Sequence, residues 1–273
     1  MRFAEAWYGG YAFQGAIALG LAPILLPLWV GLQRGPAAAG LVVGAFYLGQ
    51  IIAPLWGWLA DRFHWHHIIY VLGYVLIGLG TAAFPLYHIL SYWLLCALLQ
   101  GFGIAATNTI CGMYIVEFRP KPEWDQRIGW LQTLYGTGQA IGLYLAALFG
   151  HHAAWGLYLC GMLMLPGLAI GVLRLPKFPP HREQLKSNQD RPIHHLHRGP
   201  VSIFYWMHKV DWRHISHIFR GQFSLYLLAW SLVMMAIWLI FNLYPLLMQA
   251  SFSISATWSS LYYAFGATVG IIA

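Results

Sequence analysis

Long apolar segments recur along the chain and restrict what it can fold into. Each holds about 20 mostly apolar residues, the length that an α-helix needs to cross a hydrocarbon core of about 30 Å. They lack the alternation of apolar and polar residues that marks the strands of a membrane β-barrel. The sequence therefore predicts an all-α polytopic membrane protein. We identify eight segments: 8–31, 38–60, 68–90, 92–116, 128–150, 153–172, 223–249 and 256 to the end.

Charged residues are scarce and unevenly distributed. Asp, Glu, Lys and Arg make up 8% of the chain, against about 25% in a typical soluble domain. If the N-terminus is cytoplasmic, 14 of the 15 Lys and Arg residues fall on the cytoplasmic side and only Arg34 falls outside. This bias predicts a multi-pass protein of the plasma (inner) membrane with a cytoplasmic N-terminus. The net charge of +7 then reflects topology and contact with the lipid bilayer, and it does not indicate nucleic-acid binding.

The spacing of the segments predicts three parts. Residues 1–174 form a six-helix transmembrane half, residues 175–222 a cytoplasmic central loop, and residues 223–273 the first two helices of a second half. The loop begins with a polar, proline-rich stretch. It continues with apolar residues at roughly helical spacing between 204 and 219, which favours an amphipathic helix in the membrane interface.

Two stretches of the chain resemble each other. "LPLWVGLQRGPAAAGLVVGAFYLGQIIA" and "YPLLMQASFSISATWSSLYYAFGATVGIIA" each contain a proline (Pro27, Pro245) that we expect to end the opening helix. A short turn and a Gly/Ala-rich helix then reach Ile-Ile-Ala. Such a repeat predicts two halves of six spans in the same orientation. The chain would hold about 8 of 12 expected helices, either as a fragment or through loss of the last four, and the missing four-helix segment is an expected partner.

The end of the second segment carries a compact motif. Gly57, Asp61 and Arg62 resemble the Gly-x-x-x-Asp-Arg signature of the major facilitator superfamily of transporters. Glu117 and Arg127, with the nearby Tyr114 and Pro120, are similar to the pattern that follows the fourth span in many members. The six-plus-six layout and the long central loop agree with this resemblance, which covers essentially the whole chain.

The resemblance implies a conformational latch on the cytoplasmic side. In the family, the loop with Gly57, Asp61 and Arg62 holds the two halves together in the outward-open state, and Glu117 and Arg127 would belong to the same network. Glycine would let the helix end approach a neighbour closely. The simpler alternative is a solvated, positively charged membrane boundary.

Histidines follow the motif where the family usually has basic residues. The sequence continues with Phe63, His64, Trp65, His66 and His67. Imidazoles titrate near neutral pH, which would make the latch pH-sensitive; anchoring at the interface is the alternative. A zinc site formed by these histidines and those at 194–198 would need three or four convergent ligands. Adjacent histidines in loops are weak evidence for one, so we expect no metal and no cofactor.

Uncharged polar residues lie within the apolar segments. In the family, spans 1, 4, 7 and 10 line the central cavity, so the resemblance implies candidate substrate contacts in these spans. Each could instead bridge two helices. Gln139 replaces a proline in "GQAIG", which resembles a degraded antiporter motif; Gly138 and Gly142 would still allow close packing. The candidates are Gln14, Trp29, Asn108, Asn242 and Tyr244, together with Gln139 from the fifth span.

These observations favour a secondary-active or facilitative transporter that moves a small organic solute by rocker-switch alternating access. Amides and aromatic rings suit a neutral or amphipathic solute, such as a sugar-like or effluxed compound. A non-transporting receptor or scaffold of the same fold is the main alternative. An integral-membrane enzyme fits less well, because it would need acid–base partners clustered near one membrane face.

Overall fold

The computed structural model describes residues 5–176 and 222–272, and every regular element in these ranges is a helix. The predicted amphipathic helix between 204 and 219 lies outside them. The first helices are α1 (Tyr8–Gly15), the π-helix η1 (Ala16–Leu21), α2 (Ala22–Gln50), α3 (Ala53–Phe63) and α4 (His66–Ala82). The others are η2 (Phe84–Leu86), α5 (Leu90–Phe118), η3 (Lys121–Glu123), α6 (Trp124–Leu148), α7 (Ala153–Arg174), α11 (Gln222–Phe252) and α12 (Ala256–Ile272).

Four helical stretches in the described residues are long and apolar enough to cross a membrane: Tyr8–Phe63, His66–Leu86, Leu90–Phe118 and Ala153–Arg174. The first is 56 residues long and contains the first two predicted segments. Its two passes meet at Gly35, whose φ of 81° breaks the helical path. The other three predicted segments correspond to α6, α11 and α12. The prediction of an all-α helical membrane bundle is confirmed.

Two details of the predicted helices are wrong. Pro27 lies inside α2 and Pro245 lies inside α11, so neither proline ends its helix. The loss of one backbone donor within a long, packed helix is not enough to stop it. The second segment is interrupted at Ile51 and Ile52, and α3 starts at Ala53. Pro54, in the first turn of α3, has no backbone N–H to donate to the preceding turn.

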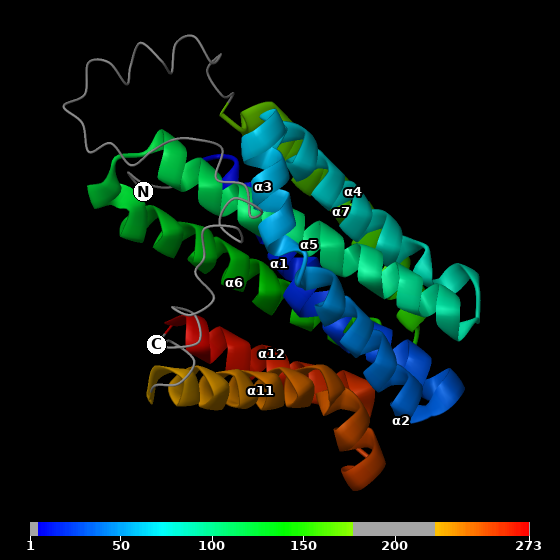
Figure 1. Ribbon diagram of the computed structural model, residues 1–273. Helices are drawn as coiled ribbons and strands as arrows, with labels where there is room; N and C mark the ends of the chain where they lie inside the picture. Colours follow the sequence, from blue (N-terminus) through cyan, green and yellow to red (C-terminus); the bar gives the residue numbers. More distant parts are fainter. Residues whose placement is uncertain (1–4, 177–221, 273) are drawn as a thin grey trace, which may run out of the picture.

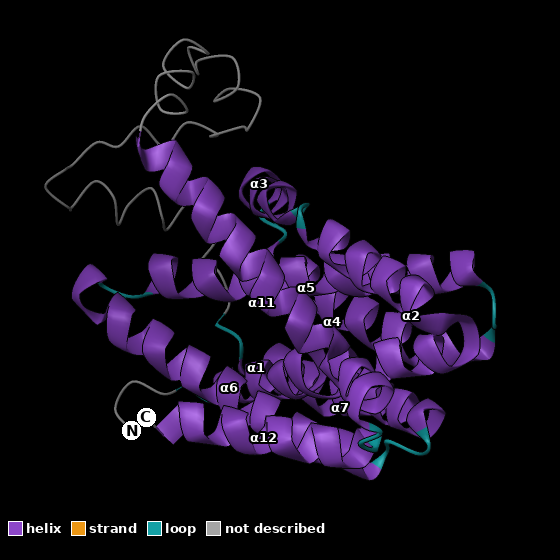
Figure 2. Ribbon diagram, turned by 90° about the horizontal axis from the view of Figure 1, so that it is seen from below, coloured by secondary structure: helices purple, strands orange, loops and turns teal. Residues whose placement is uncertain are grey.

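The helices from α1 to α7 pack against one another as a single group. α5 contacts α2, α3 and α4, while α7 contacts α1 and α4. α11 and α12 lie side by side against this group, α11 on α2 and α12 on α6 (Figure 1). Viewed from below, α12 runs next to α6 (Figure 2).

Glycines allow very close contact between the first span and α6. A Cβ atom added at Gly138 or Gly142 would overlap the carbonyl oxygen of Ala12 or Ala16. A Cβ atom added at Gly15 would overlap the backbone carbonyl oxygen of Tyr135 on α6. The prediction that Gly138 and Gly142 serve close packing is confirmed, and small residues at such seams let helix backbones touch.

Candidate functional site

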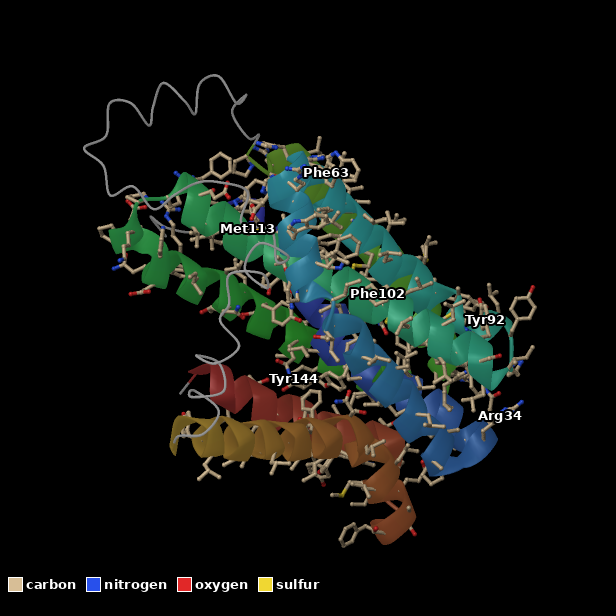
Figure 3. All side chains as sticks on the ribbon, viewed as in Figure 1. Arg34, Phe63, Tyr92, Phe102, Met113 and Tyr144 are labelled. Atoms are coloured by element: carbon tan, nitrogen blue, oxygen red, sulfur yellow. The ribbon has the colours of Figure 1, made fainter. Side chains whose placement is uncertain are left out.

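The Gly-x-x-x-Asp-Arg motif forms the end of α3 and its turn into α4. Asp61 and Arg62 are exposed on the last turn of the helix. The helix stops at His64, which adopts a left-handed conformation with φ of 57°. Phe63 and Trp65 stack with ring centroids 4.8 Å apart, which fixes the turn. In Figure 3, Phe63 marks this end of the bundle, whereas Arg34 and Tyr92 lie at the other end.

Gly57 is not closely packed in this structure. Among the described residues, a Cβ atom added there would meet only the methyl group of Thr109, at 3.5 Å, which is an ordinary van der Waals distance. The described helices therefore do not make the close approach expected at Gly57 in this conformation. Its role in a latch stays a prediction.

Asp61 faces a buried histidine at the start of α4. His66 is only 3% exposed, and its Nε2 lies 3.9 Å from Oδ1 of Asp61. Glu117, near the end of α5, completes a group in which one ligand atom of each residue lies within 4.8 Å of the others. Thus Asp61 and Glu117 are neighbours, as the latch hypothesis requires.

Arg127 belongs to a second charged group at the same end of the bundle. Its Nη1 lies 2.6 Å from Oε1 of Glu5, and its Nη2 lies 2.8 Å from Oε2 of Glu123. Arg119 also binds Glu5, with 2.8 Å between Nη2 and Oε1. Trp7 donates its indole N–H to the other oxygen of Glu5 at 3.0 Å. Glu5 therefore connects the residues preceding α1 with the ends of α5 and α6.

Sequence reasoning missed three members of this second group: Glu5, Arg119 and Glu123. One signal was available for Glu5, because a carboxylate directly before an apolar span is unusual in a chain with 8 acidic residues. Glu123 stands four residues before Arg127, the spacing of an ion pair on one helix face. No sequence pattern indicated that Glu5 would meet Arg119.

Three polar side chains connect the first span to α5. Oδ1 of Asn108 accepts hydrogen bonds from Tyr11 Oη at 3.0 Å and from Gln14 Nε2 at 2.8 Å. Gln14 is fully buried, whereas Asn108 is exposed. Gln14 and Asn108 thus bridge two helices, the alternative to a substrate contact, although the exposed side of Asn108 remains accessible.

A small pocket of about 20 Å³, partly open to solvent, lies between η1, α2, α5 and α11. Apolar side chains form most of its wall, and the polar ones are two amides, Gln100 and Asn242. Asn242 donates to the hydroxyl of Tyr47 at 2.8 Å, and Gln100 donates to Thr81 at 2.7 Å. The buried Oε1 of Gln100 has no hydrogen-bond partner among the described residues. The full lining is Ala18, Ala22, Pro23, Leu26, Pro27, Val42, Val43, Phe46, Gln100 and Asn242.

The structure does not gather all the predicted substrate contacts at this pocket. Only Asn242 lines it, and Gln100, which was not among the candidates, joins it. Trp29 packs near His88, with ring centroids 5.7 Å apart, and Tyr244 packs near Tyr263 at 5.4 Å. Gln139 is half-buried on α6, and its backbone carbonyl oxygen lies close to Gly20.

Fold and composition together define a multi-pass α-helical membrane protein. The family model of the Major Facilitator Superfamily matches residues 8–273, so the chain belongs to this superfamily. It is therefore a membrane transporter in general terms, acting on small solutes in a lipid bilayer. A search of curated proteins gave no match.

Proposed function

We propose that the chain carries a neutral or amphipathic small organic solute across the plasma (inner) membrane by alternating access, as a secondary-active or facilitative transporter with a cytoplasmic N-terminus. The pocket between α2, α5 and α11 carries this proposal. None of the described residues that line it is charged, and the polar ones among them are two amides. An apolar wall with a few placed polar groups is typical of a site for a small organic ligand, and a pocket this small would admit one only after α11 moves away from α2.

The hydrogen bonds at the pocket further restrict the kind of solute that would fit. Gln100 uses its N–H group on Thr81 and leaves Oε1 as an acceptor, while Asn242 donates to Tyr47. A solute with a hydroxyl or amide N–H could satisfy Gln100, since a buried acceptor without a partner is costly. A phosphate or a dicarboxylate would find no cation in this lining.

Alternating access needs a contact between helices that can open, and the pocket lies where α11 contacts α2. Asn242 comes from α11, whereas Gln100 and Phe46 come from the group of helices α1 to α7. Movement of α11 away from α2 would expose the pocket. In this proposal the turn with Gly57, Asp61 and Arg62, together with Glu117 and Arg127, biases which state is populated.

Solute flux in proteoliposomes tests the proposal. We expect uptake or efflux of at least one member of a panel of radiolabelled neutral solutes, and a several-fold loss of flux in Gln100→Ala and Asn242→Ala. Gln249→Ala is the matched control, because Gln249 is an exposed amide on the same helix as Asn242. Normal folding without flux of any solute would favour the alternative, a non-transporting receptor or scaffold.

A further inference from the structure

Three potential metal ligands from three different helices converge at the end of the bundle marked by Phe63. Asp61 comes from α3, His66 from α4 and Glu117 from α5, and one ligand atom of each lies within 4.8 Å of the others. We propose that these residues form a binding site for a divalent transition-metal cation such as zinc.

The distances suit a shared ion. Zinc binds imidazole nitrogen and carboxylate oxygen at about 2.0–2.2 Å, so two ligand atoms on one ion lie within about 4 Å of each other. The 3.9 Å between His66 Nε2 and Asp61 Oδ1 already falls in this range. It is longer than a hydrogen bond. A small rotation of the exposed Glu117 side chain would bring its carboxylate into the same range.

The different burial of the three side chains fixes the imidazole of His66 and leaves it accessible to an ion from water. The side chain of His66 is 4% exposed, whereas that of Asp61 is 55% exposed. The imidazole is therefore held by the surrounding helices, and an ion can reach it from water past the two exposed carboxylates. A fixed ligand lowers the entropy lost on binding.

Charge and ligand type indicate the kind of ion. Two carboxylates this close repel each other, and a divalent cation between them would remove that repulsion. A set of one imidazole and two carboxylates suits zinc or a neighbouring transition metal. Mg²⁺ and Ca²⁺ prefer oxygen ligands alone.

The histidines next to His66 do not take part. His64 and His67 are exposed, and neither belongs to the cluster with Asp61 and Glu117. The run of histidines in the sequence therefore indicates the wrong ligand set. One member of the run, His66, lies with two carboxylates that are distant from it in the sequence: Asp61 is five residues earlier and Glu117 is 51 residues later.

Zinc binding to the purified chain tests the site independently of transport. The experiment uses a purification tag without histidine and a background in which His194, His195 and His197 are replaced by glutamine, to remove the other dense group of imidazoles. Equilibrium dialysis against metal-stripped buffer with added ZnCl₂ should show a site whose affinity falls at least about tenfold in Asp61→Asn, His66→Gln and Glu117→Gln. His67→Gln should bind zinc as the background does.

Zinc-edge X-ray absorption provides a second readout. We expect one imidazole in a shell otherwise made of oxygen. Asp61 is exposed, so we expect Asp61→Asn to fold. An unchanged affinity of this variant for zinc would overturn the proposal even if His66→Gln did not fold. Two or more imidazoles on the bound zinc would also overturn it. Zinc binding without solute flux would contradict only the proposed transport function.

Discussion

Two seams of the molecule contrast in how their helices meet. In the first, α1 and η1 pack on α6 backbone to backbone through Gly15, Gly138 and Gly142. In the second, α11 and α12 meet α2 and α6 through side chains. There the side chain of Asn242 donates a hydrogen bond to the hydroxyl of Tyr47, and the hydroxyl oxygens of Tyr144 and Thr268 lie 3.4 Å apart. The three atoms nearest to a Cβ added at Gly31 on α2 all belong to the flexible side chain of Leu246.

The charged residues reinforce this contrast. Glu5 precedes α1 and binds Arg127 on α6, so the ion pair closes the end of the first seam. The rings of Tyr11 and Tyr135 stack across the same seam, 4.5 Å apart. Backbone contact cannot be loosened gradually, whereas side chains can exchange partners. We infer that α1 and α6 move as one body, and that the second seam is the one that opens in the proposed transport cycle.

The largest effect should come from filling the first seam. In Gly138→Val, the new side chain would overlap the backbone of Ala12, and we expect a loss of at least about 3 kcal/mol in the free energy of unfolding. Thermal unfolding in detergent measures it. Gly112→Val is the matched control, since no atom of the described residues lies within 4 Å of a Cβ added at Gly112. Equal melting temperatures for the two variants would show that the first seam is not tightly packed.

Removing the charge of Glu5 should have the next largest effect. Glu5→Gln leaves Arg127, whose side chain is 9% exposed, without its closest carboxylate partner. A loss of about 2 kcal/mol is expected, because a largely buried cation loses the closer of its two carboxylate partners and keeps only Glu123. Glu123→Gln should lose less than about 1 kcal/mol, because the Glu123 side chain is 34% exposed and that pair is screened by water. A larger loss in Glu123→Gln would contradict the central role of Glu5.

The second seam should show weak coupling. A double-mutant cycle of Asn242→Ala and Tyr47→Phe isolates the hydrogen bond between these residues, which is 2.8 Å long. Polar contacts between membrane helices average about 0.6 kcal/mol in such cycles, and we expect a coupling energy of this size. Urea or thermal unfolding of the four proteins measures it. A coupling above about 2 kcal/mol would mean that this seam is fixed as firmly as the first.

The smallest effect on stability is expected at Gly57. In Gly57→Ala the added methyl group meets Thr109 at a normal distance, so the free energy of unfolding should change by less than about 1 kcal/mol. If Gly57 serves a latch that closes only in another conformation, solute flux should still fall several-fold. Measuring both on one preparation separates packing from latch function. Normal flux in this variant would remove Gly57 from the proposed latch.

Much of the fold could be predicted from the sequence, because the bilayer imposes strict local rules. A chain with apolar segments of about 20 residues must satisfy its backbone groups within each segment, and this requires helices. The motif at Gly57, Asp61 and Arg62 similarly identified the superfamily. The breaks were harder to predict. Pro27 does not end its helix, whereas Pro54 lies in the first turn of a new one, since the effect of a proline depends on the packing around it.

The candidate site could be predicted only in part, because its contacts join distant positions. The sequence marked Asp61, Glu117 and Arg127, but it could not show that Glu117 lies with Asp61 and His66 while Arg127 binds Glu5. It marked Gln14 and Asn108 as polar, but their mutual hydrogen bond is a property of the packed helices. Gln100 lines the pocket, although it was not among the predicted substrate contacts.

The sequence by itself determined the class of protein: its helical membrane architecture and its superfamily, both of which depend on local hydrophobicity and a short motif. The tertiary structure decided which seam is closed by backbone contact, which amides face a pocket and which carboxylates surround a buried imidazole. The physical reason is the distance along the chain over which each determinant acts. Hydrophobic length and motif spacing act within one helix, whereas a site forms where residues from several helices are brought together by packing.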